Sequence, residues 1–171
     1  KFSLEKELVI SEDYRKSGEG KLDRFFYPLN EHTTFKVNQF FRKLTKGKEF
    51  SEKIISIKGR DFYFKKFFEK IARFDFNDLC EKNLGSEDYI KISEECIFIT
   101  IDNIPKFSDE NADKQQRFIT LIDILYEKNI PLLVSSSSKL DSMGSSKRLI
   151  KPFKRTVSRL YELTTSNNFG I

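Results

Sequence analysis

The stretch CIFITIDNIPKFSDENADKQQRFITLIDILYEKNIPLLV, residues 96–134, decides the fold class. It opens with a continuous apolar run, Cys96 to Ile101, which is typical of a strand buried on both faces of a sheet. The helix predicted after it carries an apolar stripe made of Phe118, Leu121, Ile122 and Leu125. Leu132 to Val134 give a second buried strand. Strand, helix and strand of these lengths indicate a right-handed βαβ crossover and a parallel sheet.

Patterns on the N-terminal side add a hairpin and a helix. Residues 53–64 predict an antiparallel hairpin, because apolar residues alternate on both sides of Gly59-Arg60, a pair that suits a type II′ turn. A helix that stops at Gly47 is predicted from apolar residues spaced three and four apart, namely Val37, Phe40, Phe41 and Leu44. A short strand is also predicted at residues 4–10, before a glycine-containing stretch at residues 16–21.

Three shorter signals flank the βαβ unit. Ile71 to Phe76 predicts a short strand, with Asn77 as the N-cap of a helical turn. Gly85 followed by Ser86 marks the start of another helix, whose first turn is acidic and so complements the helix dipole. The polar segment at residues 102–105 is predicted to end the first buried strand.

The last predicted element is a basic helix over residues 152–164. Phe153, Val157 and Leu160 share one face of it, and the opposite face consists of Arg155, Arg159 and Glu162. Residues 1–171 are therefore predicted to form a single α/β unit, in which a parallel βαβ sheet layer contains an inserted antiparallel hairpin.

Composition excludes several classes of protein. The 171 residues include 18 Phe, which supply the burial that disordered chains lack. With 2 Cys and 1 His, a four-ligand zinc site would need carboxylates. No apolar run approaches about 20 residues, so no transmembrane segment is predicted. Because the chain begins with Lys rather than Met, we expect a fragment or a processed form.

The positive charge is concentrated at the C-terminal end. The net charge is +5, and residues 139–171 hold 7 basic and 2 acidic residues, which accounts for all of it. A chain that binds nucleic acid usually spreads its positive field over a face of the fold. A solvated basic helix is therefore favoured over a nucleic-acid site.

Two motifs imitate nucleotide-binding sequences. Residues 17–21, SGEGK, suggest a phosphate loop, but Arg15 stands where that motif needs glycine and Leu22 where it needs Ser or Thr. Asp102, at the carboxyl end of a buried strand, imitates the magnesium-binding strand of P-loop NTPases. Because Asn103 replaces the usual second acid, the sequence favours a structural role in which both residues close a turn through side-chain-to-backbone bonds.

Nucleophilic and nucleic-acid sites have weaker signals. His32 is the single histidine and lies far in sequence from Cys80 and Cys96, so a solvated histidine and buried cysteines are favoured over a catalytic pair. Residues 62–68, FYFKKFF, have the aromatic and basic composition of single-strand binders. A strand that buries Phe on one face and exposes Lys on the other gives the same pattern and is favoured.

Arg155 and Arg159 form the strongest candidate site. A guanidinium pair projecting from a rigid helix can bind a phosphate or a carboxylate bidentately. The alternative is a solvated pair in which Glu162, three residues after Arg159, satisfies it. Composition alone leaves both interpretations open.

Several segments together carry a family resemblance. The most specific are RFITLID followed by LYE, within residues 117–127, and RTVSRL at residues 155–160. Weaker matches, in the same order along the chain, are Asp13-Tyr14-Arg15, Tyr27-Pro28-Leu29, Ile57-Lys58-Gly59-Arg60, Arg73-Phe74-Asp75-Phe76 and Asn103-Ile104-Pro105. With these segments the chain resembles the C-terminal half of the ZapE family of AAA+-type P-loop ATPases, which includes the mitochondrial AFG-type ATPase.

The resemblance implies the C-terminal portion of a P-loop NTPase fold. In that family the phosphate loop and the magnesium-binding strand lie upstream, so ATP and Mg²⁺ would be bound mainly by a missing N-terminal half. Asp102 would then not bind magnesium, and this segment alone would not hydrolyse ATP. Arg155 and Arg159 match the family's terminal helix, and we expect one of them to be an arginine finger that reaches a neighbouring subunit of a homo-oligomer.

The resemblance also implies that ATP hydrolysis drives remodelling of a protein partner at a membrane-associated assembly. In bacteria the expected partner is FtsZ in the cytoplasm, and in mitochondria it is an inner-membrane subunit reached from the matrix side. Peripheral membrane association is compatible with either. One alternative is a non-catalytic interaction module that docks through the sheet and hairpin. Specific nucleic-acid binding is not expected, because only one short segment is strongly basic.

Overall fold

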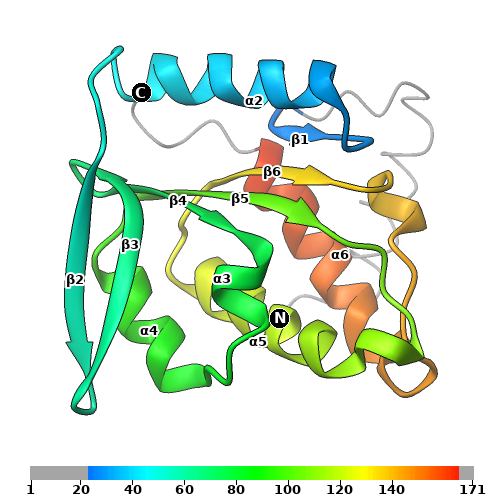
Figure 1. Ribbon diagram of the computed structural model, residues 1–171. Helices are drawn as coiled ribbons and strands as arrows, with labels where there is room; N and C mark the ends of the chain where they lie inside the picture. Colours follow the sequence, from blue (N-terminus) through cyan, green and yellow to red (C-terminus); the bar gives the residue numbers. More distant parts are fainter. Residues whose placement is uncertain (1–22, 166–171) are drawn as a thin grey trace.

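One mixed sheet forms the centre of the molecule (Figure 1). The computed structural model describes residues 23–165, so the strand predicted at residues 4–10 and the stretch at 16–21 lie outside the described residues. The strand order is β1 (Phe25–Phe26), β6 (Leu132–Ser136), β5 (Phe98–Ile104), β4 (Ile71–Asp75), β3 (Arg60–Phe68) and β2 (Ser51–Ile57). The pairs from β1 to β4 are parallel, and β3 pairs antiparallel with both β4 and β2. The predicted α/β class, with its inserted hairpin, is confirmed.

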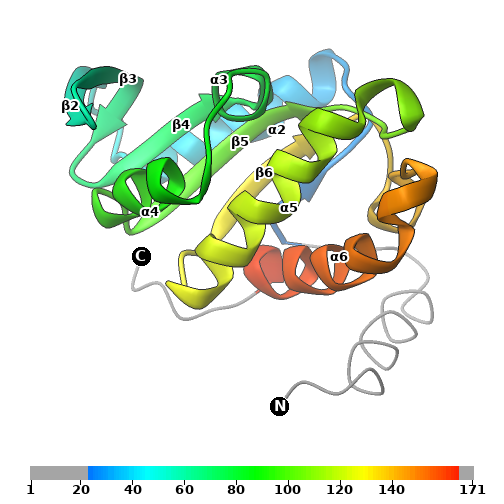
Figure 2. The same ribbon diagram turned by 90° about the horizontal axis from the view of Figure 1, so that it is seen from below.

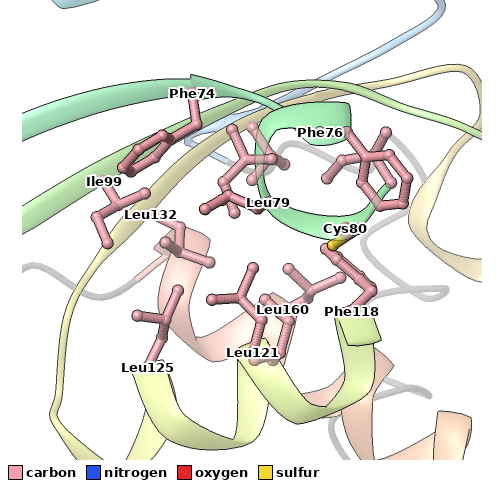
Figure 3. Packing of buried hydrophobic residues seen from close by; sticks show 14 of the residues in the cluster. Phe74, Phe76, Leu79, Cys80, Ile99, Phe118, Leu121, Leu125, Leu132 and Leu160 are labelled. Carbon is pink, nitrogen blue, oxygen red and sulfur yellow. The ribbon is translucent and has the colours of Figure 1, made fainter. Parts of the chain in front are cut away.

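Helices cover the two faces of the sheet unequally (Figures 1 and 2). Among the described helices, one face carries α2 (Glu31–Leu44) alone, which buries Val37, Phe41 and Leu44 against the strands. The other carries α3 (Phe76–Cys80), α4 (Ser86–Glu94), α5 (Ala112–Glu127) and α6 (Ile150–Thr165). The larger apolar core lies on this second face, where side chains of the sheet meet those of α3, α5 and α6 (Figure 3).

The predicted βαβ unit is present as β5, α5 and β6, with β5 and β6 adjacent and parallel. Its first strand is longer than predicted. Asp102 and Asn103 do not end β5, which continues to Ile104. Asn103 has a φ of 64°, the register shifts between Ile101 and Ile104, and the Asn103 N–H donates to Ser135 Oγ at 2.9 Å. The polar pair therefore forms a bulge, and pairing with β6 resumes after it.

The hairpin differs from the prediction in its turn. Ile57 pairs with Arg60, so the turn residues are Lys58 and Gly59, one position earlier than expected. Their φ angles of 53° and 77° are both positive, which is the signature of a type I′ turn rather than type II′. The alternation of apolar residues located the two strands correctly, but it does not distinguish these neighbouring registers.

The predicted cap of α3 is also displaced. Asp75, rather than Asn77, is the N-cap, and its carboxylate accepts the Asn77 N–H at 3.0 Å. Both side chains are good N-cap acceptors. Because β4 ends at Asp75, the helix begins at the next residue, Phe76, which is earlier than an N-cap at Asn77 would allow.

Gly144, in the loop between β6 and α6, occupies a position that only glycine fits. Its φ is +76°, and an added Cβ would overlap the carbonyl oxygen of Phe107, with which Gly144 forms an isolated bridge. We expect Gly144→Ala to lower the free energy of unfolding by about 2–4 kcal/mol, through a left-handed backbone and steric overlap together. Urea denaturation would measure the loss.

Gly47 supplies a matched control. Its φ is +73° and nothing lies within 4 Å of the added Cβ, so Gly47→Ala reports the backbone strain alone. We expect about 1 kcal/mol there. Equal losses in the two variants would contradict the steric part of the argument.

Candidate functional site

The two predicted arginines converge on one carboxylate. Arg155 and Arg159 lie one turn apart on α6, and both contact Asp123 on the neighbouring helix α5. Arg159 Nη1 donates to Asp123 Oδ1 at 2.6 Å, and Arg155 Nη2 to Asp123 Oδ2 at 3.4 Å. The two most specific segments of the family resemblance, in α5 and α6, are thus in contact through Asp123 and the two arginines.

Arg159 contacts both the carboxylate of Asp123 and the ring of Tyr126. Its Cζ lies 4.5 Å from the centre of the Tyr126 ring, and its side chain is 20% exposed. The Tyr126 hydroxyl donates to Glu162 at 3.3 Å. The alternative in which Glu162 satisfies Arg159 is therefore wrong, because a carboxylate on the adjacent helix takes that place. Helical spacing within α6 alone could not indicate this partner.

Arg155 is held more loosely than Arg159. Its side chain is 46% exposed, and its contact with Asp123 is the longer of the two. An exposed ion pair of this length contributes between 0 and about 1 kcal/mol. Most of the guanidinium donors of Arg155 therefore remain available to an anion that approaches the α6 surface.

Asp102 belongs to a side-chain network at the carboxyl edge of the parallel strands. Arg73 Nε donates to its Oδ2 at 2.7 Å, and Ser135 Oγ donates to its Oδ1 at 3.1 Å. Asn103 Nδ2 donates to Asp75 Oδ1 at 2.6 Å. The structural role favoured for Asp102 and Asn103 agrees with these contacts, but their side chains bond to other side chains rather than to the backbone of a turn.

Neither a metal cluster nor a membrane-spanning helix occurs in the described part of the chain. Among residues 23–165, no group of three or more His, Cys, Asp or Glu side chains is arranged to bind a metal ion. No helix within the same residues is both long and apolar enough to cross a bilayer.

The histidine, the two cysteines and the aromatic strand at residues 62–68 have the exposure that the sequence favoured. His32 is exposed in the first turn of α2, whereas Cys80 and Cys96 are buried, free thiols. In β3, Phe62 and Phe64 are buried while Tyr63, Lys65 and Lys66 are exposed, as a half-buried strand requires. That Asp123 and Tyr126 are the partners of the arginines could not be predicted from the sequence, because both lie on a different helix.

The two thiols should be unreactive in the folded protein. Burial raises the pKa of Cys96 to about 12 and also raises that of Cys80. At pH 8 a thiol with such a pKa is ionised in about one molecule in ten thousand, whereas an unfolded cysteine is about a quarter ionised. Iodoacetamide labelling should therefore be at least about a hundredfold slower in buffer than in urea. Rapid labelling of the native protein would show that a thiol is accessible.

Comparison with known proteins identifies the family of the chain. The sequence model of the AFG1-like ATPases matches residues 7–169, nearly the whole chain. The chain belongs to the AFG1-like ATPase family. No solved structure matches it.

Three relatives represent fungi, animals and bacteria. An uncharacterized protein of Schizosaccharomyces pombe is 29% identical over 126 residues, which is 72% of this chain and 28% of that protein. Lactation elevated protein 1 homolog B of Danio rerio is 27% identical, over 66% of this chain and 29% of that protein. Cell division protein ZapE of Escherichia coli is 25% identical, over 88% of this chain and 40% of that protein. The chain thus spans well under half the length of these relatives.

Proposed function

We propose that this chain is the C-terminal part of an ATPase that couples ATP hydrolysis to remodelling of a protein partner, and that Arg155 is its arginine finger. The observation that supports this assignment is the contrast between the two arginines. Arg155 is 46% exposed on a helix that is itself anchored in the core by Phe153 and Leu160, whereas Arg159 is 20% exposed. A finger needs a free guanidinium on a rigid support.

In this proposal Asp123 and Arg159 have a supporting role. The tight contact of Arg159 with Asp123 and Tyr126 fixes α6 against α5. The carboxylate of Asp123 also limits the directions in which Arg155 can point, since it accepts one of its N–H groups. When a neighbouring subunit brings a triphosphate to this surface, Arg155 exchanges a weak contact for a stronger one with the phosphate.

ATP and Mg²⁺ would be bound by parts of the protein outside residues 23–165. Within these described residues, no cluster of side chains is arranged to bind a metal ion. The working form would be a homo-oligomer, because a finger acts on the nucleotide of its neighbour. The partner would be a protein such as FtsZ, in the bacterial cytoplasm, or a membrane-protein subunit reached from the mitochondrial matrix. One relative is named a cell division protein, which supports the first of these.

The decisive test begins with the full coding sequence. We expect a phosphate loop and an Asp-Glu strand upstream of this segment. We also expect the full-length protein to hydrolyse ATP and residues 1–171 alone not to hydrolyse it. If the upstream sequence lacks a phosphate loop, or the full-length protein has no ATPase activity, the proposal fails.

A non-catalytic interaction module is the second candidate. Ile54 and Tyr63 face each other across β2 and β3 and are 55% and 54% exposed, so the hairpin presents an apolar pair to solvent. Such exposed apolar side chains are common at protein contacts. This candidate predicts that the segment binds a partner whether or not a nucleotide is present.

A further inference from the structure

A cleft of about 570 Å³ is lined by residues of α2, the helix that covers one face of the sheet. It is bounded by the C-terminal end of α2, by the loop that follows this helix, and by β3 and β4. Its basic lining residues are Arg42, Lys48, Lys66 and Arg73. Glu49 is the single carboxylate of its lining among the described residues. None of the residues placed in the candidate site on α6 lines this cleft, so it is a separate feature.

Three of the four cations have no ion-pair partner in the part of the chain that the structure describes. Arg73 is neutralised by Asp102 at 2.7 Å, but Arg42, Lys48 and Lys66 pair with no described carboxylate. Lys66 also lies directly opposite Arg73 in the β3–β4 ladder. Because Asp102 already compensates Arg73, Lys66 is the charge of this opposed pair that an anion in the cleft would neutralise.

Two of the four cations, Lys66 and Arg73, each lie over an aromatic ring. Phe41 and Phe50 are in contact, with ring centres 4.8 Å apart. The Lys66 ammonium lies 5.7 Å from the centre of the Phe50 ring, and the Arg73 guanidinium lies 5.3 Å from that of Phe41. These contacts restrict the two side chains before any ligand arrives and so reduce the entropy lost on binding.

A second cleft of about 580 Å³ adjoins the first, since Asn38 of α2 lines both. Its wall includes Leu29 and Phe35, which are 40% and 63% exposed, and its charged lining residue is Glu31. The surface along α2 is therefore apolar near the start of the helix and basic near its end.

We propose that this surface binds an acidic peptide segment of a partner protein, with carboxylates in the basic cleft and an apolar side chain against Phe35 and Leu29. A peptide fits better than single-stranded nucleic acid for two reasons. Of the two aromatic rings that line the basic cleft, Phe41 is buried and only Phe50 is exposed, so the cleft lacks the series of stacking platforms that single-strand binders use. The adjoining cleft contains Glu31 instead of further cations, so a continuous phosphate backbone would be repelled there.

Fluorescence anisotropy with a labelled peptide that has a glutamate-rich half and a leucine-containing half tests the proposal. We expect the 171-residue chain to bind it, with an affinity that falls as salt is added. Arg42→Gln combined with Lys66→Gln should weaken binding at least about tenfold. The matched control, Lys91→Gln with Lys128→Gln, removes the same charge from exposed positions on α4 and after α5, on the other face of the sheet, and should bind as the wild type does.

Two further measurements complete the test. The same peptide with glutamine in place of glutamate should bind at least about tenfold more weakly, and Phe35→Ser should weaken binding of the leucine-containing peptide. No binding of the glutamate peptide by the wild type, or equal losses in the two double variants, overturns the proposal. Tighter binding of a single-stranded oligothymidylate that depends on Arg42 and Lys66 also overturns it. These outcomes do not depend on ATP turnover, so they are distinct from a failure of the ATPase proposal.

Discussion

Arg155→Ala is expected to lower ATP turnover by the full-length protein about a thousandfold while leaving nucleotide affinity nearly unchanged. The finger neutralises charge that develops on the γ-phosphate during hydrolysis, so its removal affects the transition state far more than the bound nucleotide. Because Arg155 contributes only a long, exposed contact with Asp123 to the fold, the melting temperature should change little. Steady-state hydrolysis and equilibrium nucleotide binding would measure the two effects.

Arg148→Ala is the matched control for this experiment. Arg148 precedes α6, is 59% exposed and forms a 3.6 Å ion pair with Asp113, so its loss removes an exposed arginine from the same region. We expect normal turnover from it. Arg155→Lys should restore little activity, because an ammonium cannot replace the two-pronged guanidinium. Arg159→Ala, in contrast, should lower the melting temperature, since it removes the contacts with Asp123 and Tyr126.

Mixed oligomers distinguish action on a neighbour from action within one subunit. Subunits with Arg155→Ala keep an intact nucleotide site, and subunits with an inactivated phosphate loop keep an intact finger. Mixing the two should recover part of the turnover, because each variant supplies what the other lacks. If Arg155→Ala retains full turnover, or if mixing recovers none, Arg155 does not act as a finger between subunits.

The central elements could be predicted because their signals are local. The continuous apolar run in β5 and the stripe of α5 each follow from a few neighbouring residues. The turn and the cap were displaced by one or two positions, since Lys58-Gly59 and Gly59-Arg60, or Asp75 and Asn77, offer similar chemistry. β1 is only two residues long and had no signal, because its pairing with β6 depends on the rest of the sheet.

The distribution of charge shows why sites are harder to predict than strands. Divided along the sequence, the body of the chain is neutral and the tail is basic. In the folded protein, acids of α5 partly neutralise that tail, since Asp113 pairs with Arg148 and Asp123 with both candidate arginines. Three cations that have no ion-pair partner among the described residues, Arg42, Lys48 and Lys66, line the cleft beside α2, to which Arg42 and Lys66 come from distant segments. No pattern along the sequence predicts that these residues lie close together.

Arg24 is the clearest structural residue that the sequence did not reveal. Its side chain is almost fully buried, at 2% exposure, and burial lowers the pKa of its guanidinium. Nε donates to the Leu132 carbonyl at 2.9 Å, and Nη2 donates to the Leu163 carbonyl at 3.0 Å. Its backbone N–H also donates to the Thr164 carbonyl at 3.1 Å. A single residue thus joins strand β6 to the C-terminal end of α6, where helix carbonyls lack partners and the helix dipole favours a cation.

Arg24→Ala is therefore expected to lower the free energy of unfolding by about 3–5 kcal/mol, because it leaves two buried carbonyls without their donors and opens a cavity. Arg24→Lys should recover only part of this, since one ammonium cannot reach both carbonyls in the same geometry. Arg148→Ala should change the value by no more than about 0.5 kcal/mol, because its arginine is exposed. Urea denaturation at constant slope would measure all three variants. A loss in Arg24→Ala as small as that in Arg148→Ala would mean that α6 is held on the sheet by its apolar face alone.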